Sequence, residues 1–111
     1  MPAAEAYLRE NVRKAITLTD LCVYMDVPER TLRQGFREVY GLSPMAHLKA
    51  LRMQAARVQL RQPRRDRRIS DIASECGFTH LGRFSIDYGR CFGETPSETR
   101  FRSLSAWAPV R

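Results

Sequence analysis

The sequence predicts an all-α fold, made of two helix-turn-helix subdomains joined by a long linker helix, with about seven helices in all. Three observations lead to this prediction. Apolar residues recur every three to four residues along most of the chain, which is the spacing of helices that bury one face. The 6 glycines and 6 prolines fall between these periodic segments, and one pattern of apolar residues occurs twice. At 111 residues the chain has room for one compact domain, or for two very small ones that need each other.

The first subdomain is expected over residues 1–43 and begins with an amphipathic helix from Ala3 to about Lys14. A second helix is expected to start at Thr19, whose hydroxyl can cap it, with Asp20 complementing the positive end of the helix dipole. The inner positions of these two helices are Leu8, Val12, Leu18, Leu21, Cys22 and Met25.

A third helix is expected from Pro28 to Tyr40, because proline is favoured in the first turn, where its missing N–H costs nothing. Its inner side carries Leu32 and Phe36, followed by either Val39 or Tyr40. Its outer side is polar and mostly basic, with Glu29, Arg30, Arg33, Gln34 and Arg37.

The linker helix is assigned to residues 44–62, because Ser43-Pro44 is a strong helix start and Gln62-Pro63 is a stop. About 18 residues at 1.5 Å each would make a rod of roughly 27 Å. A single apolar stripe is expected along it, formed by Met45, Leu48, Leu51, Ala55 and Val58.

The second subdomain is expected over residues 63–102. Ser70 can cap a helix that buries Ile69, Ile72 and Ala73, and Gly77 stands where that helix must stop. Thr79 can then cap a helix with Phe84, Tyr88 and either Cys91 or Phe92 on its inner side; its outer side carries His80, Gly82, Arg83, Ser85, Ile86 and Asp87.

The last helix is expected to start at Thr95, because Glu98 three residues later completes a capping box. From Phe101 onward Ser, Ala and Pro accumulate and helical periodicity is lost. Residues 103–111 are therefore expected to form a flexible tail.

The two subdomains repeat one motif. Leu18, Leu21 and Val27 match Ile69, Ile72 and Phe78 at an offset of 51 residues; Leu32, Phe36, Tyr40, Gly41 and Pro44 match Phe84, Tyr88, Phe92, Gly93 and Pro96 at an offset of 52. The one-residue slip falls at the turn or at the start of the second helix, where an insertion is easiest to absorb. The sequence therefore predicts an internal duplication.

Each copy consists of two short helices joined by a tight turn, the unit that places its second helix in a DNA major groove. A linker of the predicted length, with a short connector, can hold two such helices about 34 Å apart, the distance between successive major grooves on one side of a duplex. The 19 basic against 12 acidic residues leave a charge of +7, which favours polyanionic partners such as nucleic acid or an anionic membrane surface. The basic residues are almost all arginine, which suits phosphate and guanine contacts, although an arginine-rich genome would give the same count.

The sequence predicts a protein that is not an enzyme and that has no cofactor and no metal site. It has no constellation of His, Cys and Asp, no glycine-rich phosphate loop and no carboxylate pair outside helix caps and surfaces. The 3 cysteines lack metal-ligand spacing and are expected to be buried, reduced residues. No apolar run approaches a membrane span and no leader is recognisable, so no membrane contact and a cytoplasmic location are expected.

At this point the chain resembles the DNA-binding domain of the AraC/XylS family of bacterial transcription regulators, from about Ala3 to Arg102. The residues that carry the resemblance are Ile69-x-x-Ile72-Ala73-x-x-Cys76-Gly77-Phe78, Phe84-Ser85, Phe92-Gly93-x-Thr95-Pro96, Leu32-Arg33-x-x-Phe36, Gly41-x-Ser43-Pro44 and Leu51-Arg52-x-x-x-Ala56. The resemblance implies that two helices enter adjacent major grooves of double-stranded promoter DNA, and that the protein recruits RNA polymerase as an activator.

The resemblance also assigns residues. The candidates for reading bases are Arg30, Arg33, Gln34, Leu81, Gly82, Arg83, Ser85 and Ile86. The candidates for phosphate contact are Arg37, Thr79, His80, Arg64, Arg65, Arg67 and Arg68; the arginines of this set that follow the linker helix are equally well explained as a solvated charge run.

The sequence departs from the family pattern in two respects. Leu81, Gly82 and Ile86 stand where polar readers would be expected, so readout by the second subdomain is expected to depend on few polar side chains and on methyl contacts. The effector-binding domain of most family members is also expected to be absent from this chain, which makes it either a short regulator or, as we favour, a carboxy-terminal fragment.

Two other functions fit the same features. A non-specific architectural DNA binder needs the charge but no base readers, so discrimination between DNA sequences separates it from a regulator. A protein-interaction module docking on RNA polymerase would keep binding its partner after Arg30, Arg33 and Arg83 were neutralised.

Overall fold

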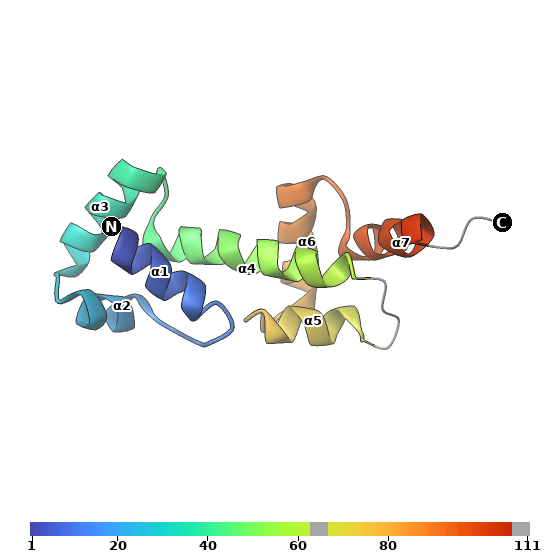
Figure 1. Cartoon of the computed structure of the whole chain (residues 1–111), viewed down its shortest axis with the longest axis horizontal. Helices are drawn as coiled ribbons and strands as arrows, with labels where there is room; N and C mark the ends of the chain where they lie inside the picture. The colour runs from blue at the N-terminus through green and yellow to red at the C-terminus, as the bar shows by residue number, and fades with distance from the viewer. Residues whose placement is uncertain (63–66, 108–111) are drawn as a thin grey trace. The chain divides into compact units, whose positions relative to one another are not determined.

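The computed structural model describes residues 1–62 and 67–107, with residues 105–107 as backbone only. Within these ranges it contains seven helices and no strand (Figure 1), so the all-α prediction is confirmed. The helices are α1 (Pro2–Glu10), α2 (Leu18–Met25), α3 (Glu29–Tyr40), α4 (Pro44–Leu60), α5 (Ile69–Glu75), α6 (Leu81–Phe92) and α7 (Pro96–Trp107).

The chain divides into two compact units, residues 1–52 and residues 53–111, and α4 begins in the first and ends in the second. In the first unit, α1, α2 and α3 pack with the first part of α4 (Figure 1). Its core consists of Ala4, Leu8, Leu21, Leu32, Phe36 and Leu48, all fully or almost fully buried. The inner positions predicted for α3 are confirmed, with Tyr40 at the edge of the core and Val39 exposed.

The helix starts in the first unit differ slightly from those predicted. Thr17, not Thr19, caps α2: its Oγ1 accepts from the Asp20 N–H at 3.1 Å, and the Asp20 carboxylate accepts from the Thr17 N–H at 2.8 Å. Thr17 is the cap because only this choice puts an acidic residue at the third helical position, N3, where it completes a reciprocal capping box. Similarly, Pro28 is the N-cap of α3 and not its first residue.

The first helix is also shorter than predicted, since α1 ends at Glu10 and not near Lys14. The Asn11 side chain bonds back to the Tyr7 carbonyl oxygen at 2.7 Å, which satisfies an acceptor at the helix end. The connector after α1 is then fixed by Arg52, whose guanidinium donates to the Val12 and Lys14 carbonyl oxygens at 3.0 and 2.7 Å. Burial lowers the pKa of Arg52.

The second unit has its own core, formed by Met53, Ala56, Leu60, Ile72, Ala73, Cys76, Phe84 and Tyr88. The prediction of one apolar stripe along α4 is wrong in part. Leu48 belongs to the first core, while Met53, Ala56 and Leu60 belong to the second, and Val58 is 55% exposed. A helix that packs against two cores does not bury one continuous face. The apolar stripe that fits the first core therefore cannot be extended to Val58, which was predicted to be buried and is exposed.

Two predicted caps in the second unit are also wrong. Helix α5 has Arg68 as its N-cap, so Ser70 lies inside the helix, and α6 has His80 as its N-cap in place of Thr79. Neither cap residue makes a side-chain hydrogen bond to its helix. The turn between the two helices does contain the predicted glycine, since Gly77 adopts φ 92°, a conformation that side chains rarely tolerate. On α6, Phe92 lies against the core and Cys91 is exposed, against the expectation that all cysteines are buried.

Helix α7 begins as predicted. Thr95 Oγ1 accepts from the Glu98 N–H at 3.1 Å and the Glu98 carboxylate accepts from the Thr95 N–H at 2.9 Å; these hydrogen bonds lower the pKa of Glu98. The buried Tyr88 hydroxyl lies 2.8 Å from Thr99 Oγ1, which ties α7 to α6. The helix continues to Trp107, so the predicted tail over residues 103–111 is wrong as far as residue 107, and residues 108–111 lie outside the described part.

Candidate DNA-binding surface

Two helix-turn-helix motifs are present, α2 with α3 in the first unit and α5 with α6 in the second. Helices α3 and α6 are each 12 residues long and each ends on a glycine with positive φ, Gly41 at 75° and Gly93 at 72°. The predicted one-residue slip between the copies falls where Val27 is followed by Pro28, and Phe78 by Thr79 and then His80. Thr79 is thus the extra residue of the second turn.

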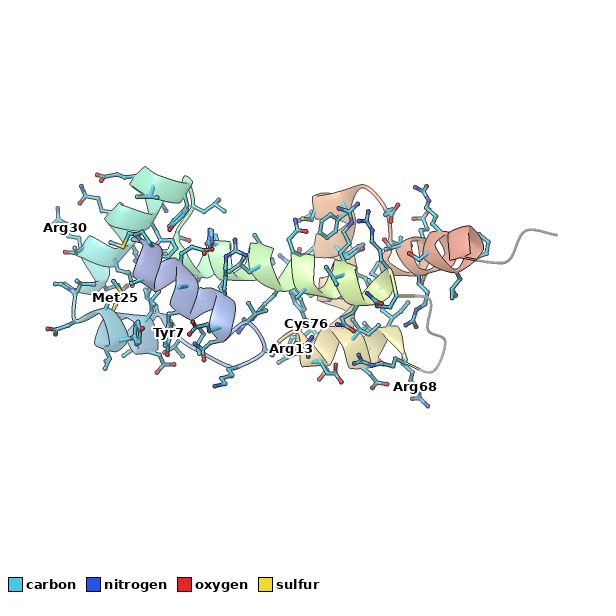
Figure 2. The ribbon with its side chains drawn as sticks, viewed as in Figure 1. Tyr7, Arg13, Met25, Arg30, Arg68 and Cys76 are labelled. Atoms are coloured by element: carbon cyan, nitrogen blue, oxygen red, sulfur yellow. The ribbon has the colours of Figure 1, made fainter. Side chains whose placement is uncertain are left out.

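The outer face of α3 is polar and exposed, as predicted, because Leu32 and Phe36 turn the opposite face into the core. Figure 2 shows Arg30 projecting from this helix. Arg33 pairs with Glu29 at 2.7 Å, and Gln34 Nε2 donates to Glu38 at 3.1 Å. Exposed pairs one helical turn apart contribute only about 0.2–0.5 kcal/mol. Arg33 and Gln34 can therefore exchange these partners for DNA at small cost.

The outer face of α6 is less polar. Leu81 and Ile86 are 45% and 54% exposed, and Ser85 is only half-exposed. Arg83 is well exposed and lies 3.4 Å from Asp87. Gly82 is exposed, and a Cβ added there would meet no atom within 4 Å. None of the described residues of this unit therefore requires glycine here.

Most of the predicted phosphate contacts that the structure describes are exposed. Thr79 and His80 at the start of α6, Arg37 on α3 and Arg68 at the start of α5 are exposed, and Figure 2 shows Arg68 pointing away from the ribbon. Arg64 and Arg65 lie outside the described residues.

Arg67 differs from the other phosphate candidates because it is engaged within its own unit. Its guanidinium donates to Gln59 at 3.2 Å, forms an ion pair with Glu75, and keeps only 20% of its side chain exposed. Its carbonyl oxygen also accepts from Arg100. The position of Arg67 therefore favours a role in holding α4, α5 and α7 together, and argues against the predicted contact with phosphate.

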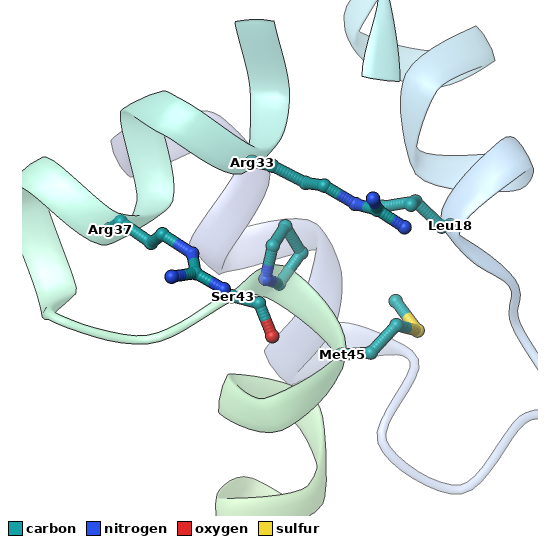
Figure 3. A pocket seen from close by; sticks show the side chains of 6 residues that line it. Leu18, Arg33, Arg37, Ser43 and Met45 are labelled. Carbon is teal, nitrogen blue, oxygen red and sulfur yellow. The ribbon is translucent and has the colours of Figure 1, made fainter. Parts of the chain in front are cut away.

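A pocket of about 260 Å³ opens in the first unit at the meeting of α2, α3 and α4 (Figure 3). It is lined by Leu18, Arg33, Arg37, Ser43, Pro44 and Met45. Sequence reasoning did not predict it, because its walls come from three helix segments that only the tertiary fold brings together. The side-chain pairs on the outer faces of α3 and α6 were not predicted either. The spacing of four residues between Glu29 and Arg33, and between Arg83 and Asp87, is nevertheless visible in the sequence.

Among residues 1–62 and 67–104, no three side chains of His, Cys, Asp or Glu lie close enough to hold a metal ion. In the part that the structure describes, no helix is both long and apolar enough to cross a bilayer.

A duplicated helix-turn-helix, with an exposed outer face on the second helix of each motif, is the arrangement of a DNA-binding domain of the transcription-regulator class. A family model described as a helix-turn-helix domain matches residues 21–102. The relatives include a probable thc operon regulatory protein from Rhodococcus erythropolis, 37% identical over 93 residues, and XylDLEGF operon transcriptional activator 2 from Pseudomonas putida, 34% identical over 94 residues. The chain belongs to the AraC/XylS family and corresponds to its DNA-binding domain.

These two alignments cover 83% and 84% of this chain, but only 28% of the Rhodococcus protein and 60% of the Pseudomonas protein. Solved structures match over nearly the whole domain. A probable AraC family regulator from Rhodopseudomonas palustris superposes with a TM-score of 0.84 at 35% identity, covering 90% of this chain and 93% of that one. The DNA-binding domain of AdpA, solved with a target DNA, has the same fold, with a TM-score of 0.86 at 21% identity over 96% of this chain and 94% of that one.

Proposed function

We propose that this chain reads two short DNA elements in adjacent major grooves, one with α3 and one with α6, and thereby directs a transcription regulator to its promoters. The observation that carries the proposal is the repeated presentation of an outward face on the second helix of each motif, while the inner face of the same helix is buried. This is the arrangement by which helix-turn-helix proteins insert a helix into the major groove.

In the first motif, Arg30 and Gln34 are proposed as base readers. They lie one helical turn apart on the exposed side of α3. Arginine can bond guanine O6 and N7 together, and glutamine can bond adenine N6 and N7. Arg33, the third predicted reader, belongs to the same DNA-facing side but also lines the pocket.

In the second motif, Arg83 is proposed as the main polar reader, assisted by Ser85. Leu81 and Ile86 offer apolar contact to thymine methyl groups, and Gly82 allows the helix backbone to approach the bases closely. Thr79 and His80 stand at the start of α6, where a phosphate contact is favoured by the helix dipole. Arg68 is placed for a further backbone contact from α5.

The proposed action on transcription is activation through RNA polymerase, in the cytoplasm. Support comes from the Pseudomonas relative, whose name describes it as a transcriptional activator. The charge of +7 also fits a non-specific architectural DNA binder. The two functions differ in one measurable property, because an architectural binder does not discriminate between bases.

Base-by-base competition tests the proposal. Starting from a duplex selected by the wild-type chain, we expect Arg30→Ala and Arg83→Ala each to lose about 1–3 kcal/mol of binding free energy and to relax specificity at one base position. Arg13→Ala removes the same charge from the connector between α1 and α2 and serves as the matched control. Equal weakening on all duplexes by Arg30→Ala and Arg83→Ala would contradict base reading by these residues.

A further inference from the structure

We propose that the pocket between α2, α3 and α4 binds one phosphodiester group of the DNA backbone, held by Arg33 and Arg37. This inference rests on the proposed function, since it requires α3 to approach DNA. It assigns Arg33 to a contact with the DNA backbone and leaves Arg30 and Gln34 as the base readers of the first motif.

Two arginine side chains line this pocket. Arg33 and Arg37 are one helical turn apart on α3, and both line it. Figure 3 shows Arg33 extending toward Leu18 and Arg37 toward Ser43, so the two cations approach the cavity from one wall. No carboxylate belongs to the six residues that line it. The lining itself therefore carries two positive side chains, of which Arg33 is paired with Glu29 from outside the lining.

The opposite wall adds one side-chain hydrogen-bond donor, the Ser43 hydroxyl. Ser43 Oγ accepts from the Ala46 N–H at 3.3 Å, which leaves the proton of its hydroxyl available to an anion. Pro44 opens α4, a helix of 17 residues, and Pro44 and Met45 both line the cavity, so the first turn of this helix lies at the same wall. Hydroxyl, guanidinium and helix end together match the oxygen atoms of a phosphate group.

The position of the pocket favours a phosphate of the DNA backbone over a free anion. Leu18 is the first residue of α2 and lines the cavity. In helix-turn-helix proteins the first helix of the motif crosses the backbone while the second lies in the groove. A phosphate at the start of α2 and beside α3 therefore lies where the strand passes when α3 is inserted.

Glu29 becomes a competitor for Arg33 in this arrangement. Its carboxylate holds Arg33 at 2.7 Å, and both side chains are about half exposed, at 54% and 56%. A DNA phosphate must replace this carboxylate as the partner of Arg33. We therefore expect Glu29→Gln to strengthen binding to all duplexes by a similar factor, with base preference unchanged.

The decisive measurement is the salt dependence of binding to a selected duplex and to unrelated duplexes. Loss of one phosphate contact reduces the slope of log K against log salt by about 0.9. The variant Arg33→Ala/Arg37→Ala should lose about this amount, with affinity falling by a similar factor on every sequence. A control with equal charge, Arg13→Ala/Arg30→Ala, should instead lose discrimination at one base. Circular dichroism of each variant checks that the fold is kept.

Three outcomes would overturn the pocket assignment. An unchanged slope, or a loss confined to one base position, would return Arg33 to the base readers. A reduction of about 1.8 would place the two arginines on separate phosphates. If the wild-type chain still discriminates between sequences in any of these cases, the proposed function stands without the pocket; if it discriminates between none, the proposed function fails by itself.

Inorganic phosphate distinguishes a free anion from the DNA backbone as the source of the ligand. It is titrated at constant ionic strength while the side-chain N–H signals of Arg33 and Arg37 are followed by NMR. We expect only weak shifts, and larger ones with duplex DNA. Saturable binding of inorganic phosphate that blocks the response to DNA would contradict the assignment to the backbone.

Discussion

At the scale of single residues, the role of an exposed arginine depends on neighbours that its own sequence position does not reveal. Arg30, Arg33 and Arg37 all lie on the outer side of α3, and the helical period predicted this correctly. The period does not show that Arg33 and Arg37 share a pocket with Ser43, because that contact depends on where α4 begins in space. The outer face of α3 was therefore predictable, but which of its arginines line the pocket was not.

Gly82 gives a test in which folding and binding respond in opposite directions. A Cβ at Gly82 meets open space inside a helix, so Gly82→Ala should stabilise the fold by about 0.5–1 kcal/mol. If the backbone of α6 approaches DNA here, the same methyl group should weaken binding. Thermal unfolding and duplex titration measure the two effects.

Gly89→Ala is the matched control for Gly82→Ala, because Gly89 lies in the same helix and also faces open space. It should stabilise the fold without weakening binding. Equal affinities for Gly82→Ala and the wild-type chain would show that the backbone of α6 makes no close approach at this residue.

Glu5 gives the first unit a defined dependence on pH. Burial disfavours its charged form, but hydrogen bonds from His47 at 2.6 Å and from Arg9, together with their charges, outweigh burial and lower the pKa of Glu5. A lowered pKa means that the ionised carboxylate stabilises the fold above the unfolded pKa of about 4.3, and that this stability is lost as the pH falls through the folded-state value.

We therefore expect the unfolding free energy of the wild-type chain to fall more steeply between about pH 5 and pH 3 than that of Glu5→Gln. Denaturant titration at several pH values measures the difference. Glu10→Gln, which removes an exposed carboxylate from the end of the same helix, is the matched control. Parallel curves for the wild type and Glu5→Gln would rule out this contribution.

At the scale of elements, helical period and capping chemistry predicted where most helices lie but not always which residue starts them. The ladders Leu32 with Phe36, and Phe84 with Tyr88, are buried as expected because a spacing of four residues keeps them on one face. Cap positions shifted where several competent residues stand close together, as with Thr17 and Thr19. The choice between them depends on which threonine is followed, three residues later, by an acidic side chain that accepts from the N–H of the cap residue.

Helix α4 is the element that the sequence describes least well. Its residues divide between two cores, so the same helix has buried positions that no single stripe connects. Leu60→Ala should destabilise the second unit by about 2–5 kcal/mol, because Leu60 is fully buried. Val58→Ala shortens an exposed side chain two residues before Leu60 on the same helix. It should change the free energy of unfolding by less than about 0.5 kcal/mol.

Chemical denaturation of Leu60→Ala and Val58→Ala separates this account from the single-stripe prediction. Comparable losses for the two variants would mean that Val58 is also packed, and would contradict the division of α4 between two cores.

At the scale of the whole molecule, the internal repeat and the charge of +7 were readable from the sequence, and both bear on how the chain meets DNA. Helices α3 and α6 correspond at an offset of 52 residues, and their glycine caps correspond as well. If both helices read bases as proposed, one molecule can contact two DNA elements without a second copy of the chain. The base preference of each copy was not predictable, because it depends on side-chain contacts that form only with DNA.

Selection of bound duplexes from a randomised DNA library, near physiological salt, tests the central claim most directly. We expect enrichment of two short elements whose centres lie about 10–10.5 base pairs apart, one for each helix-turn-helix motif. Enrichment of a single element would contradict reading by both α3 and α6. Binding that is sensitive to salt but enriches no sequence would contradict specific reading altogether and would identify the chain as an architectural DNA binder.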